Sequence, residues 1–179
     1  MYDLVFKIVN NTNNVPSEQY LNYVKNVRNT IGGKLYYDQV SRSIQLAKEN
    51  DKNIIDINIA SGIKGLGLID ILFSENILND KTLLIIDEPE VHLHPQWEIE
   101  YARIIVELSQ LGIPIIISTH SAYMLQAIPY YVNKFKTNDI TKFYFGEKLP
   151  NETKTSFIDV TNDLEVIFKA IAKPMQELL

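Results

Sequence analysis

Two short runs of apolar residues, each ending in polar side chains, dominate the hydrophobic pattern of this chain. The first run, residues 83–86, ends in Asp87 and Glu88, and the second, residues 113–117, ends in Ser-Thr-His at 118–120. Unbroken apolar runs of this length are typical of buried strands, and the amphipathic stretch between them predicts a crossover helix. The pattern therefore predicts two parallel strands whose polar ends form one site at the same edge of a sheet.

The rest of the pattern predicts helices and strands on both sides of this unit. Apolar residues at helical spacing predict helices at about residues 17–31, 61–77, 96–111, 121–128 and 162–175. Gly32, Gly112 and Pro129 are expected to end the first, third and fourth of these. Glu165 follows Asn162 at the spacing of a capping box. Strands are expected at residues 2–9, 34–40, 43–47, 54–60, 140–145 and 155–160, with a charged link at 49–53.

Composition narrows the class of protein. With 179 residues, 46% of them hydrophobic, the chain can bury the core of a single domain, which is the expectation here. The net charge of −5 and the lack of a basic run argue against direct binding of nucleic acid. There is no cysteine, no stretch long enough to span a membrane and no signal peptide at the N-terminus, so a cytoplasmic protein without a membrane partner is expected.

Three motifs occur in the order found in ABC-type P-loop ATPases. They are Ala-Ser-Gly-Ile-Lys at 60–64, Asp-Glu-Pro-Glu-Val-His-Leu-His-Pro at 87–95 and Ser-Thr-His-Ser at 118–121. They resemble the signature, the Walker B strand with its D-loop, and the switch histidine of that family. More narrowly, they are similar to bacterial AAA/ABC-like ATPases of the overcoming-lysogenization-defect and anti-phage group. The resemblance extends over residues 54–179, whereas residues 1–53 are expected to form a strand, helix and hairpin that precede the signature.

The resemblance implies a fold and a reaction. The fold would be the α/β C-terminal lobe of an ABC ATPase head, a truncated P-loop domain with a largely parallel sheet flanked by helices. Asp87 would hold Mg²⁺ through its water shell, and Glu88 would act as general base on the attacking water. His120 would contact the γ-phosphate. The competing interpretation of Asp87 and Glu88 is two solvated carboxylates that end a strand, and that of His120 is a structural histidine.

Other residues would act at an interface between subunits. By the same resemblance, Ser61, Gly62 and Lys64 belong to a signature that reaches the nucleotide of a second subunit, where a helix N-terminus favours an anion. Ser61 also suits an ordinary helix cap. The D-loop positions that would lie on the dimer interface are Val91, His92, Leu93 and His94.

His92 and His94 leave a further hypothesis open, since their spacing also occurs in metal sites. Together with Asp87, Glu88 and His120 they would form the centre of a metallohydrolase or nuclease. The flanking Pro89 and Pro95 and the motifs around them favour the interface loop instead, with His94 and Pro95 leading into the following helix.

The phosphate-binding loop of the family is absent from the sequence. No Gly-x-x-x-x-Gly-Lys-Ser/Thr motif occurs, and the nearest fragment, Gly32-Gly33-Lys34, is followed by Leu35 instead of a hydroxyl residue. The chain is therefore expected to be the C-terminal part of a longer ATPase, cut or encoded as a remnant. ATP and Mg²⁺ would bind the complete protein and not this chain alone. The expected partners are a missing N-terminal lobe or a second copy, and an effector protein. The alternative is a non-catalytic interaction or regulatory module.

Overall fold

The computed structural model describes residues 18–40, 42–48, 51–55, 61–74, 77–78, 81–148 and 154–176. Two compact units, Met1–Ile128 and Pro129–Leu179, divide the chain. The expectation of one domain spanning both units stays a prediction. In the described stretches, no helix combines the length and the apolar character that crossing a membrane requires.

The first unit begins with a helix and a small antiparallel sheet. Its elements are α2 (Glu18–Ile31), β1 (Lys34–Asp38), β2 (Ser43–Lys48) and β3 (Asp51–Ile55), with strand order β1-β2-β3. As predicted, α2 ends at Gly32, which has a φ of +77° that favours glycine, and the next N–H bonds back to Arg28 at 2.9 Å. The predicted hairpin is also confirmed, with Lys34 opposite Ala47 and Asp38 opposite Ser43.

The expected link at 49–53 is wrong in part, because β3 already begins at Asp51. Asp51 lies opposite Lys48 and Ile55 opposite Leu46, so β3 extends the hairpin. The expected strands at 2–9 and, for its residues 56–60, at 54–60 lie outside the described residues.

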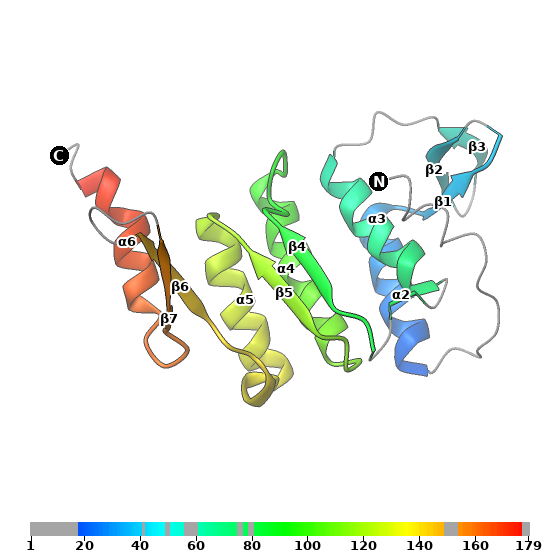
Figure 1. Cartoon of the computed structure of the whole chain (residues 1–179). Helices are drawn as coiled ribbons and strands as arrows, with labels where there is room; N and C mark the ends of the chain where they lie inside the picture. The colour runs from blue at the N-terminus through cyan, green and yellow to red at the C-terminus, as the bar shows by residue number, and fades with distance from the viewer. Residues whose placement is uncertain are drawn as a thin grey trace. The chain divides into compact units, whose positions relative to one another are not determined.

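Next come helix α3 (Ser61–Ser74), strand β4 (Leu84–Asp87), helix α4 (Pro95–Ser109) and strand β5 (Ile115–Ser118). Strands β4 and β5 are parallel, as predicted, and run side by side in Figure 1 with their tips at the same end. Helix α3 begins at the predicted Ser61, but it ends at Ser74, so Ile77 lies beyond it and donates its N–H to Leu72 at 2.9 Å. Helix α4 ends before the expected Gly112.

The hydrogen bonds at the end of α4 explain why this helix stops before Gly112. Gln110 caps the helix, and the N–H groups of Gln110, Leu111 and Gly112 each bond three residues back, at 3.2, 3.1 and 3.0 Å. This 3₁₀-type tightening closes the helix early. Gly112 does adopt a left-handed conformation, with a φ of +78°, but it lies beyond the helix cap, in the turn before β5.

The core of the first unit lies between α2, α3, α4 and β1. Among the residues of these four elements, the largest fully buried apolar side chains are Leu35, Leu66, Ile104, Leu108 and Val27. Polar contacts join the same elements. Arg28 on α2 pairs with Asp70 on α3 at 3.2 Å, and Arg103 on α4 donates to Thr30 on α2 at 3.2 Å. This packing places α3, whose first residue is Ser61, within the core.

Helix α5 (Ala122–Phe135) contradicts the predicted stop at Pro129, because it continues through the proline. A proline inside a helix removes a hydrogen bond and costs about 3 kcal/mol. The buried face of α5 continues across it, however, with Met124, Ala127, Tyr131 and Val132 all at most 9% exposed. Apolar burial along the whole helix therefore outweighs the local preference.

The second unit contains the C-terminal part of α5, a 3₁₀ turn at Asn138–Ile140, β6 (Tyr144–Lys148), β7 (Thr155–Asp159) and helix α6 (Glu165–Gln176). The predicted strand at 140–145 starts later than expected, because Ile140 bonds back to Thr137 in the 3₁₀ turn. Strands β6 and β7 form an antiparallel hairpin. The capping box is wrong: α6 begins at Glu165 itself, whose carboxylate pairs with Lys169 at 2.9 Å.

The α/β class is thus confirmed. Among the described strands, parallel pairing is limited to β4 and β5, whereas the two other small sheets are antiparallel. The expectation of a largely parallel sheet therefore holds only for the strands that carry the two polar ends.

Candidate functional site

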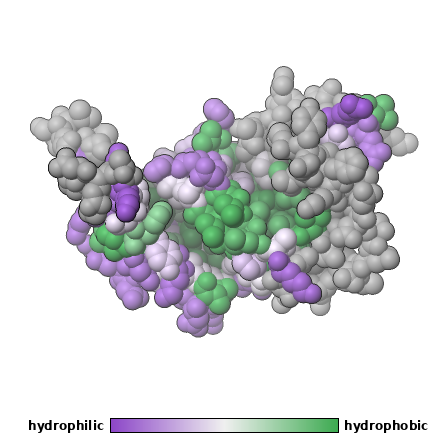
Figure 2. All heavy atoms as spheres, in the orientation of Figure 1, coloured by the Kyte–Doolittle hydropathy of each residue, from purple (hydrophilic) through white to green (hydrophobic). Residues whose placement is uncertain are grey.

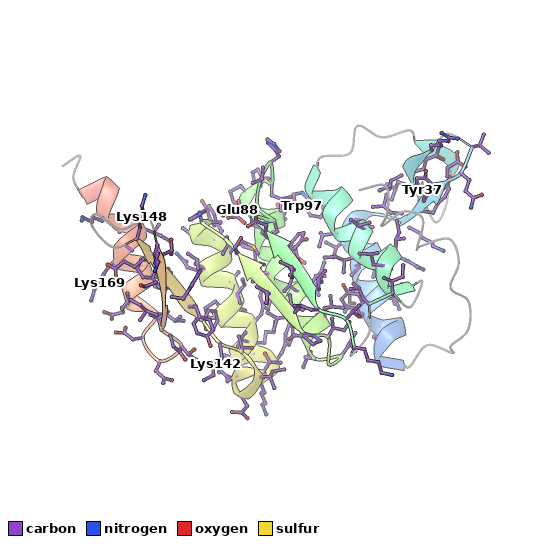
Figure 3. The ribbon with its side chains drawn as sticks, viewed as in Figure 1. Tyr37, Glu88, Trp97, Lys142, Lys148 and Lys169 are labelled. Carbon is purple, nitrogen blue, oxygen red and sulfur yellow. The ribbon has the colours of Figure 1, made fainter. Side chains whose placement is uncertain are left out.

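The polar ends of β4 and β5 meet, as the sequence predicts. Asp87 lies opposite Ser118 in the parallel register, and the Ser118 hydroxyl donates a hydrogen bond to Oδ1 of Asp87. The following residue, Glu88, donates its backbone N–H to the carbonyl of Ser118 at 3.1 Å, so the two chains stay together for one residue past the strands. Glu88 is labelled at this end of β4 in Figure 3.

The side chains of Glu88 and His120 contact each other at these strand ends. Nε2 of His120 lies 3.1 Å from Oε1 of Glu88. The His120 side chain is 91% exposed, and exposed ion pairs contribute little to stability, so this pair does not hold the fold together. Glu88 also has a φ of +47°, which for a residue with a side chain is a strained conformation of the kind found at functional sites.

The carboxyl of Glu88 is held in an unusual electrostatic environment. Partial desolvation is the largest cause of a raised pKa for Glu88, and a side-chain hydrogen bond with Glu90 and the negative charge of Glu90 raise this pKa further. The charge of His120 lowers it, but only partly offsets the increase. A carboxyl group with a raised pKa is better able to accept a proton near neutral pH.

The predicted interface loop after β4 is a pair of tight turns. Val91 donates its N–H to the carbonyl of Glu88 at 3.2 Å, and Leu93 donates to that of Glu90 at 2.8 Å. Val91, His92 and His94 are exposed, and Leu93 is half-buried. Their accessibility suits an interface loop, but that role stays a prediction.

His94 has a structural function at the start of α4. Its Nδ1 accepts the backbone N–H of Gln96 at 3.3 Å, so His94 is the N-cap, and Pro95 occupies the first helical position. In the part of the chain that is described, no three His, Cys, Asp or Glu side chains are grouped to hold a metal ion. The geometry therefore gives no support to the hypothesis of a metallohydrolase built on His92 and His94.

The residues predicted to form the signature begin a different element. Ser61, Gly62 and Lys64 form the first turn of α3, which is the helix N-terminus that the sequence predicts. Their side chains lie outside the described part of the structure, so the contacts of the Ser61 hydroxyl and of Lys64 stay predictions. The residues that the structure brings together are Asp87, Glu88, Ser118 and His120.

Sequence reasoning missed Glu90, which connects the two loops. Its Oε1 accepts hydrogen bonds from Oγ1 of Thr119 at 2.6 Å and from the backbone N–H groups of His120 at 2.8 Å and Ser121 at 3.0 Å. Desolvation raises the pKa of Glu90, but hydrogen bonds, chiefly from the Thr119 hydroxyl and the backbone N–H groups of Glu90 and His120, outweigh it and hold the pKa below its ordinary value. The sequence signal for this role was the second acidic residue in Asp-Glu-Pro-Glu, because the polar loop after β5 requires a hydrogen-bond acceptor.

Known proteins similar to this chain are phage proteins and SMC ATPases. Old nuclease of Escherichia phage P2 is 52% identical over 46 residues, which are 26% of this chain and 8% of that protein. Protein ea59 of Escherichia phage lambda is 31% identical over 98 residues, 54% of this chain and 16% of its own length. The chain thus matches less than a fifth of either relative.

A solved structure shows the same fold. It comes from structural work on the ATP-driven dimerization and DNA-stimulated activation of SMC ATPases, and has a TM-score of 0.52. The match covers 87% of this chain and 95% of that one at 12% identity, so it shows the fold alone. The fold is that of P-loop NTPases, as the motifs predict. Residues 11–126 match the family model for an AAA domain of the putative AbiEii toxin, type IV toxin–antitoxin system, and the chain belongs to this family.

Proposed function

We propose that the chain hydrolyses ATP as the C-terminal lobe of an ABC-type ATPase, together with a lobe that carries the phosphate loop and in a head-to-tail dimer. The observation that carries this proposal is the Glu88–His120 pair, 3.1 Å apart at the common end of two parallel strands. Open α/β sheets bind their ligands at this edge. Hydrolysis of a phosphoanhydride there needs a positioned water and a donor for the γ-phosphate, which these two side chains supply.

Each residue has one role in this reaction. The ionised carboxylate of Glu88 accepts a proton from the attacking water or orients that water, and its raised pKa suits this role. The imidazole of His120, exposed and beside Glu88, donates a hydrogen bond to the γ-phosphate. Their 3.1 Å separation places the proposed base directly beside the proposed donor to the γ-phosphate.

Asp87 fits the metal that this reaction requires. It presents carboxylate oxygens at the strand end, beside the hydroxyl of Ser118, and hard oxygen donors suit Mg²⁺. Magnesium in nucleotide sites is usually bound through one or two carboxylates together with phosphates and waters, so a larger cluster of acids is not required. When bound, Mg²⁺ would neutralise charge on the β- and γ-phosphates.

The open face of the β4–β5 pair supports the need for a second lobe. Three apolar side chains share this face and are largely exposed: Leu83 at 53%, Ile85 at 67% and Ile116 at 55%. Figure 2 shows apolar residues gathered over these strands. Parallel strands are normally covered on both faces, so a further layer is expected here. The same face also favours the second candidate, a non-catalytic module that binds a partner.

A head-to-tail dimer would bring the signature to the nucleotide. Ser61 and Gly62 begin α3, where free backbone N–H groups and the helix dipole favour a phosphate. The similar SMC ATPase is described as undergoing ATP-driven dimerization, which supports an ATP-dependent dimer for this chain. The likeness to Old nuclease supports an effector of the nuclease class.

The test is turnover in the complete ATPase, with the phosphate-loop lobe present. Glu88→Gln should reduce ATP turnover by about 10²–10⁴-fold while ATP binding is retained, since the substitution removes the base and keeps the shape. The matched control is Glu147→Gln, at an exposed position on β6, which should leave turnover unchanged. Normal turnover by Glu88→Gln would refute the role of Glu88, and a wild type that binds partners but never hydrolyses ATP would favour the interaction module.

A further inference from the structure

We propose that Glu90 is a positioning residue that holds the loop after β5, and thereby places His120 against Glu88. This inference rests on the proposed function, in which Glu88 and His120 act on ATP and water. Glu90 would not touch the nucleotide. It would act through the backbone of residues 119–121, which is named below the switch loop.

The contacts of Glu90 are concentrated on the switch loop. One carboxylate oxygen, Oε1, accepts all three hydrogen bonds, from the Thr119 hydroxyl, the His120 N–H and the Ser121 N–H, at 2.6–3.0 Å. Hydrogen bonds to an ionised acceptor are stronger than neutral ones. Three successive residues therefore donate to a single side chain from the opposite loop, and the Ser121 N–H also donates to Oγ1 of Thr119 at 3.1 Å.

The exposure of His120 makes this backbone contact important. With 91% of its side chain exposed, His120 has almost no packing that could hold its ring in place. The position of the ring therefore depends on the position of its backbone, and the backbone N–H of His120 is held by Glu90. If the switch loop moved, the 3.1 Å contact between His120 and Glu88 would be lost, while β4 and β5 would stay paired.

Glu90 itself and the far end of the switch loop are both anchored. The turn that contains Glu90 is closed by hydrogen bonds from Val91 to Glu88 and from Leu93 to Glu90. At the other end, the Ser121 hydroxyl donates to Glu98 on α4 and accepts the N–H groups of Tyr123 and Met124 at the start of α5. Glu90 thus links two segments that are each held by their own hydrogen bonds. This link between Glu90 and the switch loop is called the clamp below.

If Glu90 acts by holding the switch loop, the severity of substitutions at Glu90 should rank differently than if only its negative charge matters. Gln keeps the length of the side chain and a carbonyl oxygen that can accept the same three hydrogen bonds, but it loses the charge. Asp keeps the charge but is one methylene shorter. If position is what matters, Glu90→Gln should be milder than Glu90→Asp, and Glu90→Ala the most severe. If charge alone matters, Asp should be milder than Gln.

The first experiment is amide hydrogen exchange in the 179-residue chain, which needs no ATP turnover. In Glu90→Ala the amide of His120 should exchange about tenfold faster or more, because its acceptor is gone, whereas the amides of α4 should be unchanged. The amide of Ser121 should change less, because it also donates to Oγ1 of Thr119 at 3.1 Å. Glu90→Gln should retain most of the protection. Unchanged exchange at the His120 amide in Glu90→Ala would overturn the role of Glu90 in holding the switch loop, whatever the fate of the proposed function.

The second experiment measures steady-state turnover in the complete ATPase. Glu90→Ala should lower kcat by about 10–100-fold with little change in KM for ATP, because His120 is misplaced while nucleotide binding is intact. Glu90→Gln should restore most of kcat. The control is Glu165→Ala, which removes an exposed ion pair on α6. A normal kcat in Glu90→Ala, or rescue by Asp but not by Gln, would overturn the positioning role.

Discussion

Two glycines of α3, Gly65 and Gly67, face different neighbours and should respond in opposite ways to the same substitution. A Cβ atom at Gly67 would lie 1.6 Å from Cδ1, 2.6 Å from Cγ and 2.9 Å from Cβ of Leu35 on β1. At Gly65 the nearest atom, Cε2 of Tyr101 on α4, would be 3.4 Å away, which is an ordinary contact. The two positions thus form a matched pair within one helix.

The magnitudes follow from two opposing effects. Alanine inside a helix is more favourable than glycine by about 1 kcal/mol, and this is the main effect expected at Gly65. At Gly67 the Leu35 side chain, only 1% exposed, has no free space to enter. Overpacking of this kind costs about 1–3 kcal/mol and more where a backbone must shift. We therefore expect Gly65→Ala to be neutral or stabilising, and Gly67→Ala to be destabilising by about 1–3 kcal/mol.

The assay is denaturant unfolding followed by the fluorescence of Trp97, the only tryptophan, which lies on α4 in the same compact unit. A double variant, Leu35→Ala with Gly67→Ala, should be less destabilised than the sum of the two single variants, because the space left by Leu35 admits the new methyl group. Equal effects of Gly65→Ala and Gly67→Ala, or strict additivity in the double variant, would refute the packing of α3 against β1.

Three other predictions concern the same unit. Burial raises the pKa of Asp70, and its partner Arg28 only partly offsets this increase. The unfolding free energy of the wild type should therefore fall relative to that of Asp70→Asn as pH rises from about 3 to about 6. A relative unfolding free energy that rises over this pH range would contradict the prediction. Ser121→Ala removes the N-cap of α5 and a donor to the buried Glu98, and should cost about 1–2 kcal/mol in thermal or denaturant unfolding. The exposed apolar face of the β4–β5 pair should make the isolated chain self-associate, and Ile85→Lys should reduce that association in sedimentation velocity. Association by the wild type that Ile85→Lys leaves unchanged would exclude this face as its cause.

The sequence was sufficient for the part of the fold where local pattern and topology agree. The apolar runs before Asp87 and before Ser118 defined two strands, and the requirement that parallel strands end at one edge brought their polar residues together. Gly32 likewise marked the end of α2, because a left-handed residue there needs no information from the rest of the chain.

The remaining features depend on contacts between elements. Pro129 has a strong local preference to end a helix, but the burial of α5 on both sides of it overrides that preference. The role of Glu90 depends on the meeting of two loops that lie far apart in sequence. His94 was correctly placed at the start of α4, although its spacing from His92 suggested a metal site as well.

The central claim, a composite site shared between two subunits, is tested most directly by mixing two inactive variants of the complete ATPase. Ser61→Arg is designed to block the proposed signature, and Glu88→Gln to remove the proposed base. In a head-to-tail dimer each homodimer is inactive, whereas a mixed dimer has one site with both groups intact. Random pairing of equal amounts should restore about a quarter of wild-type turnover, because half of the dimers carry one active site of two. A mixture as inactive as its components would contradict the shared site.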